Sequence, residues 1–337
     1  MHIGSRIEHR GGASARSDRG LTPFVPPSLL ARLEKEPQRG VPAIAKDERN
    51  SAMVEAACER LPSSHELKVA DSRDLDFVDD ESVHLVVTSP PYWTLKDYEP
   101  GEGQLGYVAD YEEFNDELAK VWGHCHRVLV PGGRLVINVG DICLSRRKYG
   151  RHVVFPLHAT IQERCRELGF DNLAPIVWYK IGNANFEAGG GGFLGKPYEP
   201  GAVMKNDVEW VLFQRKGGGY RSPSLAARAL SVIPAPRHRE WFQQVWTLGG
   251  ASTKNHPAPF PLTFAERLVR MFSFAGDTVL DPFSGTGTTS AACLRWGRDS
   301  IGVEVQPKYH EQAVKRVTQL AERPEQMNLL PQFGAIG

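Results

Sequence analysis

Two apolar segments, each followed directly by a loop of unusual composition, constrain this chain more than any other feature of its sequence. The first occupies residues 83–87 and runs into Thr88-Ser89-Pro90-Pro91-Tyr92-Trp93. The second runs into Asp281-Pro282-Phe283-Ser284-Gly285-Thr286-Gly287-Thr288-Thr289. Short apolar runs bounded by turn residues are typical of buried strands. Because open α/β sheets bind ligands at the carboxyl ends of their strands, both loops are predicted to line a binding site.

The segments around these loops alternate between strand and helix patterns. We predict strands over residues 65–69, 83–88, 134–139, 173–179, 278–280 and 300–305, and helices over 111–129, 155–168, 261–274, 288–296 and 308–320. This alternation indicates an α/β fold with a doubly wound, mostly parallel, Rossmann-like sheet. From residue 182 to about 245, glycines and prolines interrupt the alternation, apart from a strand-like run at 208–213. That part is predicted to be an irregular insertion or a small second domain.

The chain divides into five regions on this basis. Residues 1–52 are rich in Arg, Pro, Gly and Ser and are expected to be a mobile N-terminal extension. Within it, a short helix near residues 28–36 carries Leu29, Leu30 and Leu33, which could dock on the core or on a second subunit. The remaining regions are a first half of the sheet domain (65–180), the insertion (181–250), a second half (251–322) and a C-terminal tail (323–337).

Composition favours a soluble enzyme-sized protein without a membrane partner. Of the 337 residues, 41% are hydrophobic and 24% charged, which is ordinary for a globular protein. The sequence contains neither an apolar run of membrane-span length nor the hydrophobic core of a signal peptide, so a cytoplasmic location is expected. Five scattered cysteines predict neither a disulfide framework nor a metal site.

The distribution of charge is more informative than its total. The formal net charge is zero, but residues 141–240 contain 15 Lys and Arg against 9 Asp and Glu. Affinity for nucleic-acid phosphates depends on local basic surface. The zero net charge therefore does not exclude a nucleic-acid partner.

The first loop suits chemistry on an exocyclic base amine. Such a nitrogen is a poor nucleophile because its lone pair is delocalised into the ring. Acceptors for its N–H bonds, here the Ser89 hydroxyl and the Pro90 carbonyl, favour the pyramidal form that attacks a methyl group. Pro91 stiffens the backbone further, and Tyr92 offers a flat surface to a base that has left the duplex.

The second loop suits a nucleotide-like cofactor. Gly285 and Gly287 allow a ligand to approach the backbone, and Glu304 ends the following strand, where acidic residues meet ribose hydroxyls. A Gly-Lys-Ser/Thr ending is missing, which excludes a triphosphate-binding P-loop. Ser290 stands where a nicotinamide fingerprint has its third glycine. A nicotinamide-dependent oxidoreductase nevertheless stays an alternative at this point.

Together the two loops resemble the motifs of DNA amino-methyltransferases, which transfer a methyl group from S-adenosylmethionine. The order of catalytic loop, variable region and cofactor loop is similar to the permuted β group of that family, and the resemblance covers roughly residues 65–320. It implies a methyltransferase sheet with Ser89, Pro90, Pro91 and Tyr92 as catalytic residues. It also implies a cofactor site made by Asp71, Ser72, His256, Pro257, Phe260, Asp281, Pro282, Phe283, Ser284, Gly285, Thr286, Gly287, Thr288 and Glu304.

The resemblance also bears on the target base. Members that methylate cytosine at N4 generally carry Ser-Pro-Pro-Tyr, whereas adenine N6 enzymes usually carry Asp or Asn in first place, so cytosine N4 is predicted and adenine N6 is the alternative. Carbon-5 cytosine enzymes use a Pro-Cys pair, which this sequence does not contain. A DNA-binding protein without activity is a further alternative, which a methyl-transfer assay separates.

Recognition of a specific sequence in double-stranded DNA is assigned to the insertion. Its basic residues give a hydrogen-bonding surface suited to phosphates and base edges; they are Lys196, Lys205, Arg215, Lys216, Arg221, Arg237 and Arg239. The resemblance implies the modification enzyme of a restriction-modification system, functionally paired with an endonuclease. A homodimer is a further expectation.

Overall fold

A long mixed sheet is the main feature of the fold. The computed structural model describes residues 3–9, 18–95, 101, 103–180, 200, 206–250 and 260–322. Within these residues the strands are β1 (Ile3–His9), β2 (Ser63–Val69), β3 (Val83–Thr88), β4 (Leu129–Val139), β5 (Ile142–Leu144), β6 (Val153–Phe155), β7 (Phe170–Tyr179), β8 (Val208–Lys216), β9 (Val245–Trp246), β10 (Thr278–Asp281) and β11 (Asp299–Glu304).

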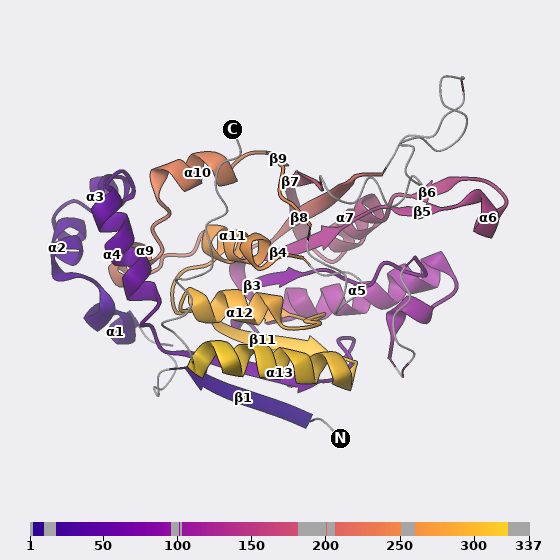
Figure 1. Ribbon diagram of the computed structural model, residues 1–337, viewed down its shortest axis with the longest axis horizontal. Coiled ribbons are helices and arrows are strands. Elements are labelled where there is room, and N and C mark those ends of the chain that lie inside the picture. Colours follow the sequence, from indigo (N-terminus) through magenta and orange to yellow (C-terminus); the bar gives the residue numbers. More distant parts are fainter. Residues whose placement is uncertain are drawn as a thin grey trace.

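The helices lie on both faces and at one end of this sheet (Figure 1). The short helices are α1 (Asp18–Leu21), α6 (Arg146–Tyr149), α9 (Leu225–Leu230), α10 (Ala235–Trp241) and the 3-10 helices η1 (Thr22–Phe24) and η2 (Leu105–Tyr107). The longer ones are α2 (Pro27–Lys35), α3 (Pro37–Ala45), α4 (Glu48–Cys58), α5 (Tyr111–Val128), α7 (Leu157–Glu167), α11 (Leu262–Phe272), α12 (Thr288–Arg295) and α13 (Pro307–Glu322).

The strand order brings distant parts of the sequence together. The large sheet runs β1-β2-β11-β10-β3-β4-β8-β7-β9. Its central strands β2, β11, β10, β3 and β4 are parallel, so their carboxyl ends meet at one edge, here called the carboxyl edge. β10 lies next to β3, which places the two loops of interest side by side. These features confirm the predicted doubly wound, mostly parallel sheet.

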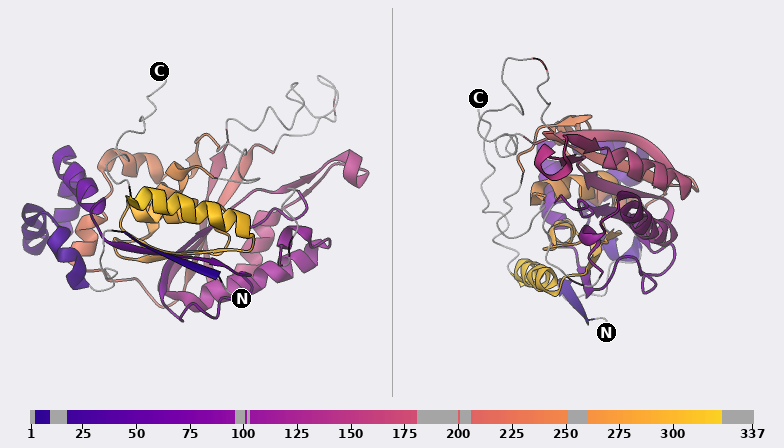
Figure 2. Two further views of the ribbon diagram at one scale, coloured as in Figure 1. Left: turned by 60° about the horizontal axis from the view of Figure 1, so that its bottom comes forward. Right: turned by 90° about the vertical axis from the view of Figure 1, so that its right-hand side faces the viewer.

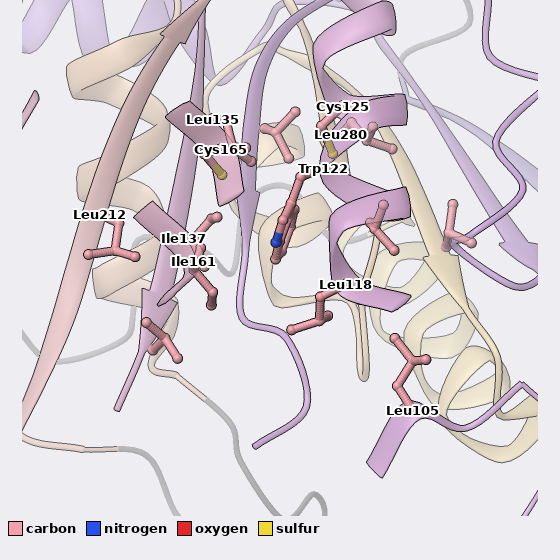
Figure 3. Packing of buried hydrophobic residues seen from close by; sticks show 14 of the residues in the cluster. Leu105, Leu118, Trp122, Cys125, Leu135, Ile137, Ile161, Cys165, Leu212 and Leu280 are labelled. Carbon is pink, nitrogen blue, oxygen red and sulfur yellow. The ribbon is translucent and has the colours of Figure 1, made fainter. Parts of the chain in front are cut away.

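Two hydrophobic layers pack against the faces of the sheet. Alternate residues of β3 point to opposite faces: Leu85 and Val87 belong to the layer under α11 and α12, and Val86 to the layer under α5 and α7. Figure 3 shows the second layer, where Trp122 of α5 lies among Leu135 of β4 and Leu280 of β10. α5 begins at the predicted residue, because the Asp110 side chain accepts a hydrogen bond from the Glu113 backbone N–H at 2.9 Å.

The expectation of a mobile extension over residues 1–52 is wrong for the residues that the structure describes there. β1 pairs antiparallel with β2 along its whole length. Leu21, Val25, Leu29 and Leu33 recur every fourth residue and form a buried cluster with α4 and α9. Prolines divide this segment into short helices, which concealed the apolar face in the sequence. α1 to α4 lie beyond the amino ends of the central strands, opposite the carboxyl edge (Figure 2).

The predicted insertion over residues 181–250 is also corrected in part. β8 is not separate from the main sheet; it runs antiparallel between β4 and β7, with Val136 opposite Phe213. α9 packs with the N-terminal helices. Residues 181–199 and 201–205 lie outside the described part of the chain, as does the tail after 322. No helix among the described residues is long and apolar enough to cross a membrane.

The buried N-terminal cluster gives a stability prediction. Leu33 is fully buried, whereas Leu30 on the same helix is only partly buried. Leu33→Ala should lower the free energy of unfolding by about 2–5 kcal/mol, and Leu30→Ala by less, because only the first leaves a cavity in a closed cluster. Urea denaturation of both variants measures the difference. A cost below about 1 kcal/mol for Leu33→Ala would mean that the helices do not pack on the body as described.

Candidate functional site

The loop after β3 lies at the carboxyl edge. Ser89 is partly exposed, while Pro90, Pro91 and Tyr92 are buried. The Tyr92 ring packs beside Gly140 at the end of β4, since a methyl group built on that glycine would lie 3.3 Å from Tyr92 Cε1. Trp93 adopts a positive φ of 43° and its indole N–H donates to the Val108 carbonyl at 2.8 Å. The residues that follow Ser89 are therefore held in place by packing and by the Trp93 hydrogen bond, whereas Ser89 itself is accessible to a ligand.

The loop after β10 turns tightly into α12. Gly285 and Gly287 have positive φ angles of 50° and 76°, a region that glycine adopts without strain. A side chain at Gly287 would also meet α13, because its Cβ would lie 2.9 Å from Cβ of Ala313. The Gly285 N–H donates to the Glu304 carboxylate at 2.9 Å, and so the turn is held against the end of β11.

One buried carboxylate joins the two loops. Asp281 Oδ1 accepts hydrogen bonds from the Thr88 hydroxyl at 2.7 Å and from the Phe283 N–H at 3.1 Å. Its Oδ2 accepts from the Thr289 hydroxyl at 2.6 Å. Asp281 is 2% exposed, so both oxygens serve the protein itself. Asp281 thus links the end of β3, the glycine loop and α12, and we call these bonds the Asp281 junction.

A pocket lies between the two loops at the carboxyl edge. The space between the loops, open mouth included, has a volume of about 590 Å³. The pocket brings together residues predicted from separate motifs, namely Asp71, Ser72, Ser89, Pro90, Pro91, Pro282, Phe283 and Glu304. Sequence reasoning missed further lining residues: Gly103, Gln104, Leu105, Val303, Val305 and Tyr309. Among these, only Val303 and Val305 could have been predicted from the sequence, because they are the neighbours of Glu304.

Two acidic side chains, Asp71 and Glu304, line this pocket, and the buried Asp281 lies just before its wall residue Pro282. Burial raises the pKa of Glu304 to about 7, although the Gln306 and Gly285 N–H groups favour its charged form. Burial likewise raises the pKa of Asp281 to about 6, against the two threonine hydroxyls. For Asp71, burial acts upward on the pKa, but the hydrogen bonds from Arg73 outweigh it and lower the pKa below its ordinary value. Asp71 is therefore the most readily ionised of the three.

Several predicted cofactor residues lie elsewhere or outside the described part of the chain. Phe260 packs on Phe264 of α11, with ring centroids 5.5 Å apart, and does not line the described pocket. His256 and Pro257 lie outside the described residues. Ser72 is buried and its hydroxyl donates to the Pro282 carbonyl. Thr288 accepts from Arg316 at 2.8 Å. Ser72 therefore ties the segment after β2 to the loop after β10, and Thr288 ties the start of α12 to α13.

The structure corrects the DNA-binding prediction for three of the basic residues. Arg215 pairs with Asp171 at 2.7 Å, and Arg221 makes two 2.6 Å hydrogen bonds to Asp277. Lys216 donates to the Leu129 carbonyl at 2.8 Å. All three lie at the amino ends of the central strands, far from Ser89, because β8 runs antiparallel to β4. They hold the sheet together rather than face a substrate at the carboxyl edge.

Of the other four predicted basic residues, two lie on α10 and two lie outside the described part of the chain. Arg237 forms an ion pair with Glu55 of α4, and Arg239 is exposed on α10 beside it. Lys196 and Lys205 lie outside the described residues. Among the residues that are described, no group of His, Cys, Asp and Glu has the arrangement of a metal site.

Comparisons with known proteins agree with this geometry. A family model described as DNA methylase, of the N6/N4 methyltransferase type, matches residues 83–315, and the chain therefore belongs to that family. This membership removes the nicotinamide-dependent alternative.

Individual relatives give the same family. The type II methyltransferase M.MjaI of Methanocaldococcus jannaschii is 36% identical over 274 residues, 73% of this chain and 88% of that protein. A putative DNA modification methylase of Thermus thermophilus, solved in complex with S-adenosylmethionine, is 51% identical, with a TM-score of 0.63 over 76% of this chain and 92% of the other. The PvuII cytosine-N4 methyltransferase, 20% identical with a TM-score of 0.54 over 77% and 92%, supports the fold alone.

The Asp281 junction predicts separable effects on methyl transfer. Thr88→Val removes only the bond toward the catalytic loop and should lower kcat about tenfold or more, with little change in cofactor affinity. Asp281→Ala leaves the buried Thr88 hydroxyl without its acceptor and the Thr289 hydroxyl with only a 3.5 Å contact to the Val87 carbonyl. Each unmade bond costs about 1–3 kcal/mol, and the variant should weaken cofactor binding as well. Calorimetric titration and methylation of DNA from a methylation-free host measure both quantities.

A matched control uses Thr94, which is exposed and directly follows Trp93. Thr94→Val makes the same chemical change outside the junction and should retain the parent kcat. Equal kcat values for Thr88→Val and Thr94→Val would contradict a positioning role for the junction.

Proposed function

We propose that this chain transfers a methyl group from S-adenosylmethionine to the exocyclic N4 of a cytosine flipped out of double-stranded DNA. One observation carries the proposal: Ser89 and Pro90 of the catalytic loop line the same pocket as Asp71 and Glu304. A base held by the first pair would face a cofactor held by the second. The family and the similarity to an S-adenosylmethionine complex support this reading.

The residues of the pocket fit S-adenosylmethionine. Glu304 stands at the end of β11 with a carboxylate suited to ribose hydroxyls, and Asp71 lies on the neighbouring strand end. Phe283 adds an aromatic surface, and the positive-φ glycines keep the turn compact. When bound, the cofactor supplies an electrophilic methyl group on a sulfonium. The protein's own contribution is to hold this group and the target amine in one place.

The catalytic loop accounts for the activation of the amine. The Ser89 hydroxyl and the Pro90 carbonyl accept the two N–H bonds of the target nitrogen, which favours its pyramidal form. Thr88, one residue earlier, is anchored to Asp281, so the acceptors are held in position before the base arrives. The stacking role proposed for Tyr92 rests on the sequence, because the residue is 5% exposed and packs in the core.

Cytosine is favoured over adenine by the serine itself. A serine in first place of the loop is typical of N4 enzymes, whereas N6 enzymes usually carry Asp or Asn there. Mass spectrometry of nucleosides from methylated DNA separates the two: N4-methylcytosine supports the proposal, and N6-methyladenine would replace it with the adenine alternative. If neither modified base is detected, the remaining alternative is a DNA-binding protein without methyltransferase activity.

We further infer a role as the modification enzyme of a restriction-modification system. The relative from Methanocaldococcus jannaschii is a type II methyltransferase, and this similarity supports the role. Single-molecule sequencing of DNA from a methylation-free host that expresses the chain would report the base and its sequence context together. Methylation at a single short motif supports the role, and methylation without sequence preference would contradict it.

Ser89→Ala provides the sharpest test within the catalytic loop. Loss of one acceptor for the target amine should lower kcat by about 100-fold, while the affinity for S-adenosylmethionine stays within about twofold of the parent. Ser82→Ala is the matched control, because Ser82 directly precedes β3, at the end opposite Ser89, and donates to the Asp79 carbonyl. An unchanged kcat for Ser89→Ala would rule out the proposed acceptor role.

A further inference from the structure

A small basic arm extends from the carboxyl edge beside the catalytic loop. It consists of β5, α6 and β6, and β5 pairs antiparallel with β6 from Ile142 opposite Phe155 to Leu144 opposite Val153. Figure 1 shows these elements at the end of the molecule opposite α1 to α4, with α6 at the tip. We call residues 142–155 the basic arm. None of the DNA-binding residues predicted from the sequence lies in it.

The base of the basic arm is rigidly held. Asp141, which directly precedes it, accepts a hydrogen bond from His158 Nδ1 at 2.6 Å across the two ends of the hairpin. The His158 ring stacks on Trp210 of β8, with centroids 4.4 Å apart and an interplanar angle of 15°. Asn206 donates to the Asp141 carbonyl at 2.9 Å. The arm therefore leaves the sheet in a defined direction.

The basic arm is also joined to the catalytic loop by aromatic contacts. Phe155, its last residue, packs on Trp93 with centroids 5.3 Å apart and on Tyr111 at 4.7 Å. Trp93 directly follows the Ser89-Pro-Pro-Tyr92 loop. Gly140, two residues before the arm, packs against the Tyr92 ring. Anything bound by the arm is thus held in register with Ser89.

All formally charged side chains of the basic arm are positive. Its sequence contains Arg146, Arg147, Lys148 and Arg151, and no Asp or Glu between residues 142 and 155. Arg146, Arg147 and Arg151 are exposed. Within the described part of the chain, no ion pair involves these three arginines, in contrast to the paired Arg215, Arg221 and Arg237. Their charge is available to a ligand.

We propose that the basic arm binds the DNA phosphate backbone next to the flipped base. This inference rests on the proposed function and adds the element that positions the duplex. Strands of three residues, at about 3.4 Å per residue, carry the cations roughly 10 Å beyond the base of the arm. That distance suits phosphates of a duplex whose target base reaches down to Ser89, because phosphate contacts fix the register of a protein on DNA.

The test compares two triple variants that lose the same charge. Arg146→Ala/Arg147→Ala/Arg151→Ala removes three cations of the basic arm. Arg32→Ala/Arg39→Ala/Arg49→Ala removes three exposed cations from α2, α3 and α4, at the opposite end of the molecule. Fluorescence anisotropy with an arbitrary duplex of about 30 base pairs, titrated at several salt concentrations, measures the salt dependence of binding. The recognition sequence is not needed, because phosphate affinity is independent of sequence.

The basic-arm variant should show a slope of log K against log salt that is smaller by about 2–3, since each phosphate contact contributes about 0.9. Its affinity at about 0.1 M salt should fall tenfold or more, while the control triple stays near the parent. Equal slopes for the parent and the basic-arm variant would overturn the proposal, as would a loss shared equally by both triples. Tighter binding of the parent to duplex RNA than to duplex DNA would also overturn it.

Two further measurements keep the outcome interpretable. If the alanine variant unfolds at a lower temperature than the parent, the corresponding Arg→Gln triple, which retains a long polar side chain, replaces it. With DNA from a methylation-free host as substrate, the KM for DNA should rise and kcat at saturating DNA should be retained. A parent that binds duplex DNA but methylates no base would refute the proposed function. The proposal for the basic arm would still be decided by the slope of log K against log salt.

Discussion

The carboxylate of Asp281 is the interaction on which the site depends. Burying an acidic group costs free energy unless hydrogen bonds compensate it. Here two threonine hydroxyls and a backbone N–H provide that compensation, and each comes from a different part of the site. Thr88 leads into the catalytic loop, Phe283 lies in the cofactor loop, and Thr289 belongs to the first turn of α12. One buried carboxylate therefore holds together the two loops that we propose meet in methyl transfer.

The sheet makes this junction possible across almost two hundred residues of sequence. β3 and β10 are adjacent and parallel, with Leu280 opposite Val86, so their final residues lie side by side. The order of motifs along the chain then matters little for the chemistry, because the strand order rather than the sequence order brings the loops together. The basic arm follows the same logic: β4, the next strand beyond β3, leads through Gly140 beside Tyr92 directly into the arm.

Local patterns predicted the centre of the fold and failed at its periphery. β3 and α5 follow from an apolar run and a regular periodicity, and the pocket follows from motifs that each end a strand. The N-terminal helices could not be predicted in this way, since prolines break the i, i+4 spacing of Leu21 to Leu33 into short pieces. Composition likewise indicated a basic region but could not show that Arg215 and Arg221 are paired with Asp171 and Asp277. Whether a cation is free depends on tertiary partners, which a single sequence does not reveal.

Hydrogen exchange tests the central claim that the Asp281 junction holds the catalytic loop. In Asp281→Ala, the amides of Ser89 and Tyr92 should exchange faster than in the parent, although position 281 is far away in sequence, because local opening depends on the bonds that hold a segment. Peptides from β7, on the other side of β8, should exchange at the parent rate. If faster exchange were confined to the cofactor loop around 281–289, the junction would not be what positions the catalytic loop.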